Sequence, residues 1–365
     1  MESYTFGRRT VITASLVEAL LRLAPAGLAQ AEPPGFVPQT DTCKMDPDGT
    51  AHVTRVVPVP GTISPEAQRF ISRPGPSGPP PSLAVQRAHT DAFRIGRAAE
   101  ARRLFPVRIK ARMLGGVRCD VITPLSMPSA NQNRVLINVH GGGFVTDSGS
   151  LVEGIPIAHL TRTTVISVYY RLAPEHPFPA AVDDTVAVHQ ELLKTYKPQS
   201  MGLFGTSAGA ILTGEVAVAL RQRGIPLPAA LGIFSGTGDM SQPGDSEALY
   251  TIWGFSGYLK PPSQRVKHDP YIGTHNPKDP VLSPIYADLR SFPPGLFITS
   301  TRDLLLSGTS NLHRAFLRAG AEAEIVVFEA LPHTFWYDYH LPETTEALNI
   351  MAKFFDKNLG ARSVA

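Results

Sequence analysis

Short apolar runs alternate with helical segments from about Asn133 to the end of the chain. Apolar strands that are bounded by polar turns and separated by helices are typical of a parallel sheet covered on both faces. We therefore predict an α/β fold with a mostly parallel central sheet flanked by helices. The runs are Val135 to Val139, Thr164 to Tyr170, Met201 to Phe204, Ala229 to Ser235, Gly295 to Thr301 and Glu324 to Phe328.

Two further apolar runs, Val107 to Met113 and Val117 to Thr123, flank a glycine pair and predict a β-hairpin. We expect the α/β domain to begin here and to span residues 107–365. The preceding segment, residues 32–106, is rich in proline and glycine up to about Pro81, which predicts irregular backbone. A helix is predicted after it, from about Leu83 to Arg103.

A long gap separates two of the predicted strands, from Gly236 to Pro294. A gap of this length is uncommon for a simple loop in a compact domain. It also contains aromatic residues between Tyr250 and Tyr258. We expect residues 240–290 to form an insertion that is part of a lid or cap.

The N-terminal residues 1–31 resemble a twin-arginine export signal. Arg8-Arg9 precedes a largely apolar stretch that ends at the small-residue site Ala29-Gln30-Ala31. Export would place the mature protein in the periplasm or outside the cell. The charges of Glu18 and Arg22 also fit an amphipathic helix of a cytoplasmic protein, because residues four apart share one helix face. We favour export.

Composition narrows the function classes. The 365 residues are 43% hydrophobic and 18% charged, which supports an ordinary globular core. A net charge of +3 without a basic run interleaved with aromatic residues excludes nucleic acid as a partner. Beyond the N-terminus, no segment has the apolar length for stable membrane insertion. Cys43 and Cys119 lack zinc-ligand spacing and could form one disulfide or remain two thiols.

The pentapeptide Gly205-Thr206-Ser207-Ala208-Gly209 lies between a predicted strand and a predicted helix that continues to Arg223 and is ended by Gly224. A G-x-S-x-G sequence in this context predicts a sharp turn that exposes the serine at the sheet edge. The flanking glycines allow the neighbouring backbone to approach closely. We predict that Ser207 is a nucleophile.

An activated serine needs a base and an acid that orients the base. Asp303 follows one predicted strand and His333 follows the next, so both lie at carboxyl ends of the sheet. The order Ser207, Asp303, His333 is that of an α/β-hydrolase. Asp279 and Asp288 are weaker acid candidates because each lies in a proline-rich loop before the strand. Asp303 could also act as a helix N-cap.

The glycine loop His140-Gly141-Gly142-Gly143-Phe144 follows the first parallel strand. Consecutive glycines leave backbone N–H groups free to bind an oxyanion. The alternative is a phosphate-binding loop, but neither G-K-[ST] nor G-x-G-x-x-G follows. With a serine turn downstream, we favour the oxyanion hole.

Several motifs together resemble the hormone-sensitive lipase family, also called bacterial family IV esterases. The similarity runs from roughly Val107 to the C-terminus, and an N-terminal cap portion is the family expectation for what precedes it. The motifs are the glycine loop, the serine turn, Tyr170 to Glu175 (YRLAPE), His176 to Ala181 (HPFPAA), Asp279-Pro280 and Leu282-Ser283-Pro284.

The resemblance implies a serine carboxylesterase that hydrolyses short-chain esters through an acyl-enzyme, without metal or cofactor. Ser207 would attack, His333 would act as base and then acid, and Asp303 would orient His333. The oxyanion would bind N–H groups of Gly142, Gly143 and Ala208, with Gly141 as a substitute donor and His140 as a support. The expected partner is a small-molecule ester, and the sequence is compatible with a homodimer.

The chain departs from the family pattern after two of these residues. Leu304 to Ser307 follow the acid where a second acidic residue is frequent, and Thr334 follows the histidine where glycine is frequent. These departures concern loop support and substrate fit rather than the reaction. The aromatic residues Phe335-Trp336-Tyr337, like those from Tyr250 to Tyr258, could line the substrate site or pack in the core.

Other functions share the same residues. An amidase, carbamate hydrolase or lactonase would use the same triad. A β-lactamase of the S-x-x-K type is disfavoured because Ala210 stands at the lysine position. A non-catalytic binding protein on this fold would be expected to have lost a triad residue, whereas all three remain.

Overall fold

The computed structural model describes residues 41–259 and 269–360, so the predicted export signal at residues 1–31 lies outside the described residues. The chain divides into two compact units, residues 1–58 and residues 59–365. The described part of the first unit is an antiparallel hairpin of β1 (Thr42–Met45) and β2 (Ala51–Thr54). Its turn contains Pro47-Asp48-Gly49, with Gly49 at φ 88°.

This hairpin and the helix α2 (Pro65–Ile71) correct the prediction of irregular backbone before Pro81. Proline is compatible with both elements here. Pro65 occupies the first turn of α2, where its missing N–H costs nothing, and the Ser64 hydroxyl accepts the N–H of Ala67 at 3.1 Å. Proline content alone therefore gave a misleading indication for these residues.

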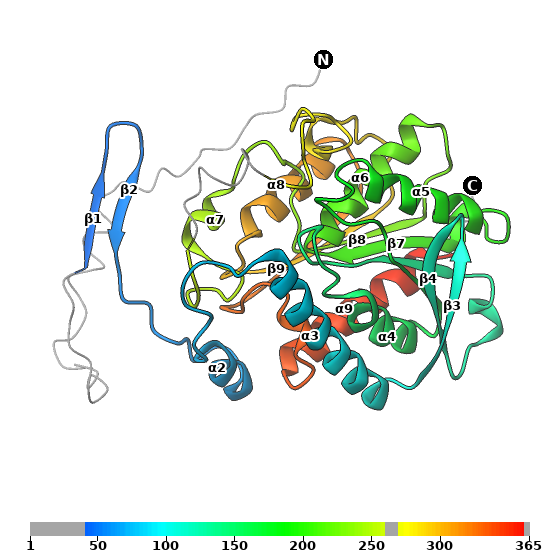
Figure 1. The fold of residues 1–365 in the computed structure, drawn as a ribbon, viewed down its shortest axis with the longest axis horizontal. Coiled ribbons are helices and arrows are strands. Elements are labelled where there is room, and N and C mark those ends of the chain that lie inside the picture. The colour runs from blue at the N-terminus through cyan, green and yellow to red at the C-terminus, as the bar shows by residue number, and fades with distance from the viewer. Residues whose placement is uncertain (1–40, 260–268, 361–365) are drawn as a thin grey trace, which may run out of the picture. The chain divides into compact units, whose positions relative to one another are not determined.

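The second unit contains an eight-stranded sheet in the order β10-β9-β8-β7-β5-β6-β4-β3 (Figure 1). The strands from β10 to β6 are parallel to one another. Strand β4 pairs antiparallel with β6, and β3 pairs antiparallel with β4. This confirms the predicted mostly parallel sheet. The strands are β3 (Val107–Leu114), β4 (Val117–Pro124), β5 (Val135–Val139), β6 (Thr164–Val168), β7 (Met201–Thr206), β8 (Ala230–Phe234), β9 (Gly295–Ser300) and β10 (Ala323–Phe328).

Helices cover both faces of this sheet, as predicted (Figure 1). Helices α5, α6 and α8 pack on one face, and α2, α3, α4 and α9 pack on the other. The helices are α3 (Leu83–Leu104), α4 (Ser150–Thr161), α5 (Ala180–Leu192), α6 (Ala208–Gln222), α7 (Asp245–Leu249), α8 (Leu306–Arg318) and α9 (Pro342–Asn358), with short 3-10 helices η1 (Ser129–Asn131), η2 (Pro198–Ser200), η4 (Pro284–Tyr286) and η5 (Phe335–Tyr337).

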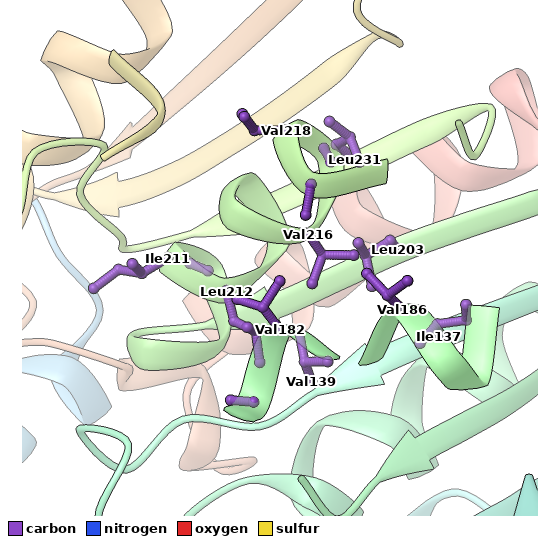
Figure 2. Close-up of a cluster of buried hydrophobic side chains, with 14 of the residues drawn as sticks. Ile137, Val139, Val182, Val186, Leu203, Ile211, Leu212, Val216, Val218 and Leu231 are labelled. Carbon is purple, nitrogen blue, oxygen red and sulfur yellow. The ribbon is translucent and has the colours of Figure 1, made fainter. Parts of the chain in front are cut away.

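The central strands are buried on both faces, and their side chains alternate between two cores. Ile137 and Val139 of β5 belong to the core under α5 and α6, whereas Leu136 belongs to the core on the opposite face. Figure 2 shows the first core, in which α5 and α6 cover β5, β7 and β8. None of the helices in the described part of the chain is both long and apolar enough to cross a membrane.

The segment between β8 and β9 contains little regular structure in its described part. It includes α7, a single bridge between Thr251 and Gly254, and η4. The region predicted as an insertion, residues 240–290, thus has a short helix and a tight turn of its own. Its role as a lid or cap stays a prediction.

The turn between β7 and α6 packs directly against the end of β5. A Cβ atom added to Gly205 would lie 2.2 Å from the carbonyl oxygen of Val139, and one added to Gly209 would lie 1.9 Å from the same atom. Both distances are far below van der Waals contact. Glycine is therefore required on each side of Ser207 for this close approach.

We predict that Gly209→Ala destabilises the protein by about 1–3 kcal/mol, because α6 must move away from β5 to admit the methyl group. Gly96→Ala is the matched control, since Gly96 is exposed on α3 with no atom within 4 Å of an added Cβ. The unfolding free energy of the control should rise by about 0.5–1 kcal/mol, because alanine has a higher helix propensity than glycine. Urea unfolding at 25 °C measures both changes, and equal stability of the Gly209 variant and the wild type would contradict the packing argument.

Candidate active site

Ser207 forms the sharp turn between β7 and α6. Its backbone has φ 59° and ψ −121°, a conformation that non-glycine residues rarely adopt. The turn is held by the Ser207 N–H, which donates to the Phe234 carbonyl oxygen at 3.0 Å. The side chain is therefore fixed at the carboxyl end of the sheet, where the sequence placed it.

The structure brings the three predicted residues Ser207, Asp303 and His333 together. His333 Nε2 lies 2.9 Å from Ser207 Oγ, and His333 Nδ1 lies 2.9 Å from Asp303 Oδ1. His333 is only 8% exposed and Asp303 only 1% exposed, so water is largely excluded from the second contact. This geometry allows the imidazole to take the serine proton while the carboxylate orients the ring.

Asp303 is a buried carboxylate that remains ionised. Burial opposes ionisation, but the charge of His333 and hydrogen bonds from His333, Ser235 and the Leu305 N–H hold its pKa below the usual value. The Leu305 N–H donates to Asp303 Oδ1 at 2.8 Å. Asp303 is not the N-cap of α8, because that helix starts at Leu306 with Leu305 in the cap position.

Ser235 is a site residue that the sequence reasoning missed. It follows β8 with φ 56°, and its hydroxyl donates to Asp303 Oδ2 and lies 2.7 Å from His333 Nδ1. Thr299 of β9 also donates to Asp303 Oδ2, at 3.2 Å. Their position at the ends of β8 and β9, which lie between the strand that leads to Ser207 and the strand that leads to His333, was the available signal.

The glycine loop after β5 has the backbone of a tight turn. Gly142 and Gly143 have φ 118° and 61°, and the N–H of Thr146 donates to the Gly142 carbonyl oxygen at 3.0 Å. A Cβ on Gly142 would lie 2.1 Å from the Thr146 carbonyl oxygen, so a side chain does not fit there. Within the described part of the chain, the N–H groups of Gly142, Gly143 and Ala208 donate to no protein acceptor.

The first glycine of the loop differs from the other two. The N–H of Gly141, which the sequence suggested as a substitute oxyanion donor, is one of the groups that oppose the rise in the pKa of the buried Glu153 carboxyl. His140 supports the loop, because its Nδ1 lies 2.8 Å from the Gly141 carbonyl oxygen. Its ring also stacks on Tyr170 at 4.1 Å, and the Tyr170 hydroxyl donates to the His140 carbonyl oxygen at 2.6 Å.

Helix α3 is tied to the residues that follow this loop through Arg87. The guanidinium donates to the carbonyl oxygens of Val145 at 2.9 Å and Ala173 at 3.0 Å, and to both carboxylate oxygens of Glu175 at 2.7 Å. These hydrogen bonds lower the pKa of Glu175 to about 2. The YRLAPE motif thus provides a docking point for α3.

The two aromatic groups that the sequence left open have different environments. Phe335, Trp336 and Tyr337 are buried, which makes them core residues. Trp253 and Phe255 are about half exposed. They flank Gly254, where an added Cβ would lie 3.5 Å from Arg302 and 3.7 Å from Pro332, so this turn lies against the loops that carry Asp303 and His333.

The described residues offer no cluster of three or more histidine, cysteine, aspartate or glutamate side chains suited to a metal ion. The two cysteines are free thiols, Cys43 exposed and Cys119 buried. Burial raises the pKa of the Cys119 thiol to about 12, so it is not an activated nucleophile.

Comparisons with known proteins agree on the type of fold. A family profile described as alpha/beta hydrolase fold matches residues 136–337. An acetyl-hydrolase of Streptomyces hygroscopicus is 33% identical over 234 residues, which cover 62% of this chain and 77% of that protein. An esterase of Acinetobacter venetianus is 29% identical over 272 residues, covering 69% and 84%.

Solved structures are also similar. The crystal structure of an esterase named E25 has a TM-score of 0.72 and 31% identity, covering 84% of this chain and 98% of that one. The crystal structure of an esterase from the bacterial hormone-sensitive lipase family has a TM-score of 0.67 and 30% identity, covering 81% and 99%.

The electrostatics of Asp303 predict how acid affects stability. Because its pKa is lower in the folded protein than in the unfolded chain, ionised Asp303 stabilises the fold above pH 3.8, and this stabilisation is lost as the pH falls through the folded pKa. The Asp303→Asn variant has no ionisable group at this position, so it lacks this pH-dependent stabilisation. We expect the difference in unfolding free energy between wild type and this variant to shrink below pH 3.8, and urea titrations at several pH values measure it. A difference that stays constant down to the lowest pH would contradict this.

Proposed function

Because this chain belongs to the bacterial hormone-sensitive lipase family of the alpha/beta hydrolase fold and is a carboxylic-ester hydrolase, we propose that it hydrolyses short-chain esters through an acyl-enzyme on Ser207. The observation that carries the mechanism is the continuous contact from Ser207 Oγ through His333 to Asp303. A serine hydroxyl is a weak nucleophile unless an adjacent base removes its proton.

In the first half of the proposed reaction, Ser207 Oγ attacks the ester carbonyl carbon while its proton moves to His333 Nε2. The carbonyl electron pair moves to the oxygen and gives a tetrahedral oxyanion. When this intermediate collapses, the bond to the alcohol oxygen breaks and His333 Nε2 protonates that oxygen. The alcohol leaves, and the acyl group remains on Ser207 as an ester.

In the second half, a water molecule attacks the acyl carbon and transfers a proton to His333 Nε2. Collapse of the second tetrahedral intermediate returns this proton to Ser207 Oγ and releases the carboxylic acid. In both halves Asp303 stabilises the imidazolium, and its burial strengthens that interaction because the local dielectric is low. Ser235 and Thr299 keep the carboxylate in place by donating to its outer oxygen.

We assign the oxyanion hole to the N–H groups of Gly142, Gly143 and Ala208. Their lack of protein acceptors within the described residues supports this assignment, as does the position of Ala208 at the N-terminus of α6. Each such donor contributes on the order of 10²–10³ in turnover.

The preference for short acyl chains is supported by one similar protein that is named for acetyl hydrolysis. The turn around Gly254 lies against the acid and histidine loops. We propose that its half-exposed aromatic side chains Trp253 and Phe255 contact the acyl or alcohol group of an ester.

We predict that Ser207→Ala lowers kcat for p-nitrophenyl acetate about 10⁴-fold or more, with no loss of stability. The wild type should release a burst of p-nitrophenol if deacylation limits turnover, and the variant should release none. Ser129→Ala, at an exposed serine in η1, is the control and should behave as wild type. Substantial turnover by the Ser207 variant would refute the acyl-enzyme.

A series of p-nitrophenyl esters from acetyl to palmitoyl tests the substrate class. We expect kcat/KM for the acetyl and butyryl esters to exceed that for the palmitoyl ester by about tenfold or more, because pocket size discriminates between chain lengths. Matched amide, carbamate and lactone substrates should react more slowly than the best ester. Activity that increases toward the palmitoyl ester would contradict the short-chain proposal.

A further inference from the structure

We infer that Glu153 is a positioning residue whose carboxylate aligns the glycine loop, the serine turn and the histidine loop with one another. The inference rests on the proposed function for the roles of these three loops. Glu153 lies in α4 and is 5% exposed, and it has no contact with Ser207, His333 or Asp303 among the hydrogen bonds of the described residues. It therefore acts through its neighbours.

Four hydrogen-bond donors surround the Glu153 carboxyl group. Asn138 Nδ2 of β5 donates to Oε2 at 3.0 Å, and the Tyr337 hydroxyl donates to Oε1. The Gly141 N–H and the Thr206 hydroxyl face the same carboxyl group and, like these two hydrogen bonds, oppose the rise of its pKa. They come from β5, the loop after it, the end of β7 and η5, which are far apart in sequence.

Three of these donors adjoin the proposed catalytic groups. Gly141 precedes the oxyanion donors Gly142 and Gly143, and Thr206 precedes Ser207. Tyr337 lies in η5, four residues after His333, and its N–H donates to the Thr334 carbonyl oxygen at 3.0 Å. One carboxylate thus fixes the distances between the oxyanion hole, the nucleophile and the base.

Further hydrogen bonds surround two of these donors. The Ser167 hydroxyl lies 3.2 Å from the Asn138 side-chain oxygen, and its single proton also reaches the Ser150 carbonyl oxygen. The Thr206 hydroxyl oxygen accepts the Trp336 indole N–H at 3.3 Å, which leaves the Thr206 proton for Glu153. As a carboxylate, Glu153 accepts from these neighbours, whereas a proton on Glu153 would require the Tyr337 or Thr206 hydroxyl to turn from donor to acceptor.

The surroundings of the carboxyl group are otherwise closed. Beside Glu153 and Thr206 lies a small internal cavity with room for no more than about one water molecule, walled by apolar side chains such as Phe204, Phe234 and Met351. In this apolar surrounding, hydrogen bonds to a charged group are strong, but burying the charge costs free energy. Removing the charge while keeping the shape should consequently change the alignment of the loops rather than the core.

Glu153 should also make catalysis depend on pH. Burial raises its pKa to about 8, against the effect of its four donors. The titratable groups that face it are Tyr337 from η5, Tyr339 from the loop after η5 and Tyr170 from the loop after β6. The His140–Asp147 pair flanks the same glycine loop, with a 3.6 Å separation. Protonation of Glu153 as the pH falls through about 8 would displace one donor and misalign its loop.

The test compares Glu153→Gln with the wild type on p-nitrophenyl acetate across pH 6–9.5. At the top of this range we expect kcat of the variant to be about 10–100-fold lower, with KM within about twofold and an unchanged melting temperature. Because wild-type Glu153 is protonated at low pH, the ratio of wild-type to variant kcat should fall as the pH drops through about 8. Glu153→Asp, which keeps the charge, should restore part of kcat.

A second buried glutamate is the matched control. Glu215 in α6 accepts the Tyr271 hydroxyl, and its Oε1 has no hydrogen-bond partner in the described part of the chain. Burial raises its pKa well above the usual value, so glutamine closely replaces its neutral form. Glu215→Gln should therefore keep wild-type kcat at every pH. This variant tests whether replacing any buried glutamate by glutamine gives the same loss of kcat.

Several outcomes would overturn the inference. A kcat for Glu153→Gln within twofold of wild type would do so. A loss that is independent of pH, or equal in Glu215→Gln, would show that Glu153 is merely structural. If Glu153→Gln does not fold, Tyr337→Phe removes one donor alone, and it must lower kcat at unchanged KM. Activity retained by Ser207→Ala would instead refute the proposed function, whatever Glu153 does.

Discussion

The arrangement of this site depends on the contact between the end of β5 and the turn that contains Ser207. The Val139 carbonyl oxygen lies where side chains of residues 205 and 209 would otherwise be, so only glycine at both positions lets the turn settle there. This contact places the glycine loop, which continues β5, beside Ser207, which follows β7. The strained backbone of Ser207 is the local consequence, and it is stabilised because strands on both sides bind its neighbours.

Two buried carboxyl groups near the site have opposite pKa shifts, and their partners explain the difference. Asp303 faces His333, whose charge compensates for burial, and its pKa is lowered. Glu153 faces only neutral donors, which do not fully compensate, and its pKa is raised to about 8. A buried carboxyl group thus stays ionised at Asp303, whereas the one at Glu153 gains or loses its proton near pH 8.

The sequence predicted the strands of the sheet closely, because each apolar run is bounded by turn residues. It also predicted which three residues the sheet brings together, since parallel strands present their following loops at one edge. The strand that was predicted to reach Tyr170 ends instead at Val168, and the Tyr170 hydroxyl binds the His140 carbonyl oxygen. Local patterns could not show this contact.

The supporting residues were not predictable for a related reason. Ser235, Glu153 and Arg87 act through partners that lie between 15 and 184 positions away in the chain. A serine after a strand, a glutamate in a helix or an arginine in a helix has no local signature of such a role. Only the packed structure assigns them, because it shows which buried donors and acceptors meet.

The guanidinium of Arg87 has a consequence for how this chain can be divided. Its hydrogen bonds to Val145, Ala173 and Glu175 cross the boundary at residue 107, where the sheet begins. A fragment that started at residue 107 would contain every strand of that sheet and all three triad residues, yet two backbone oxygens beside the glycine loop would lose their donor. Helix α3, which precedes the sheet, is therefore bonded directly to the segments that follow the glycine loop.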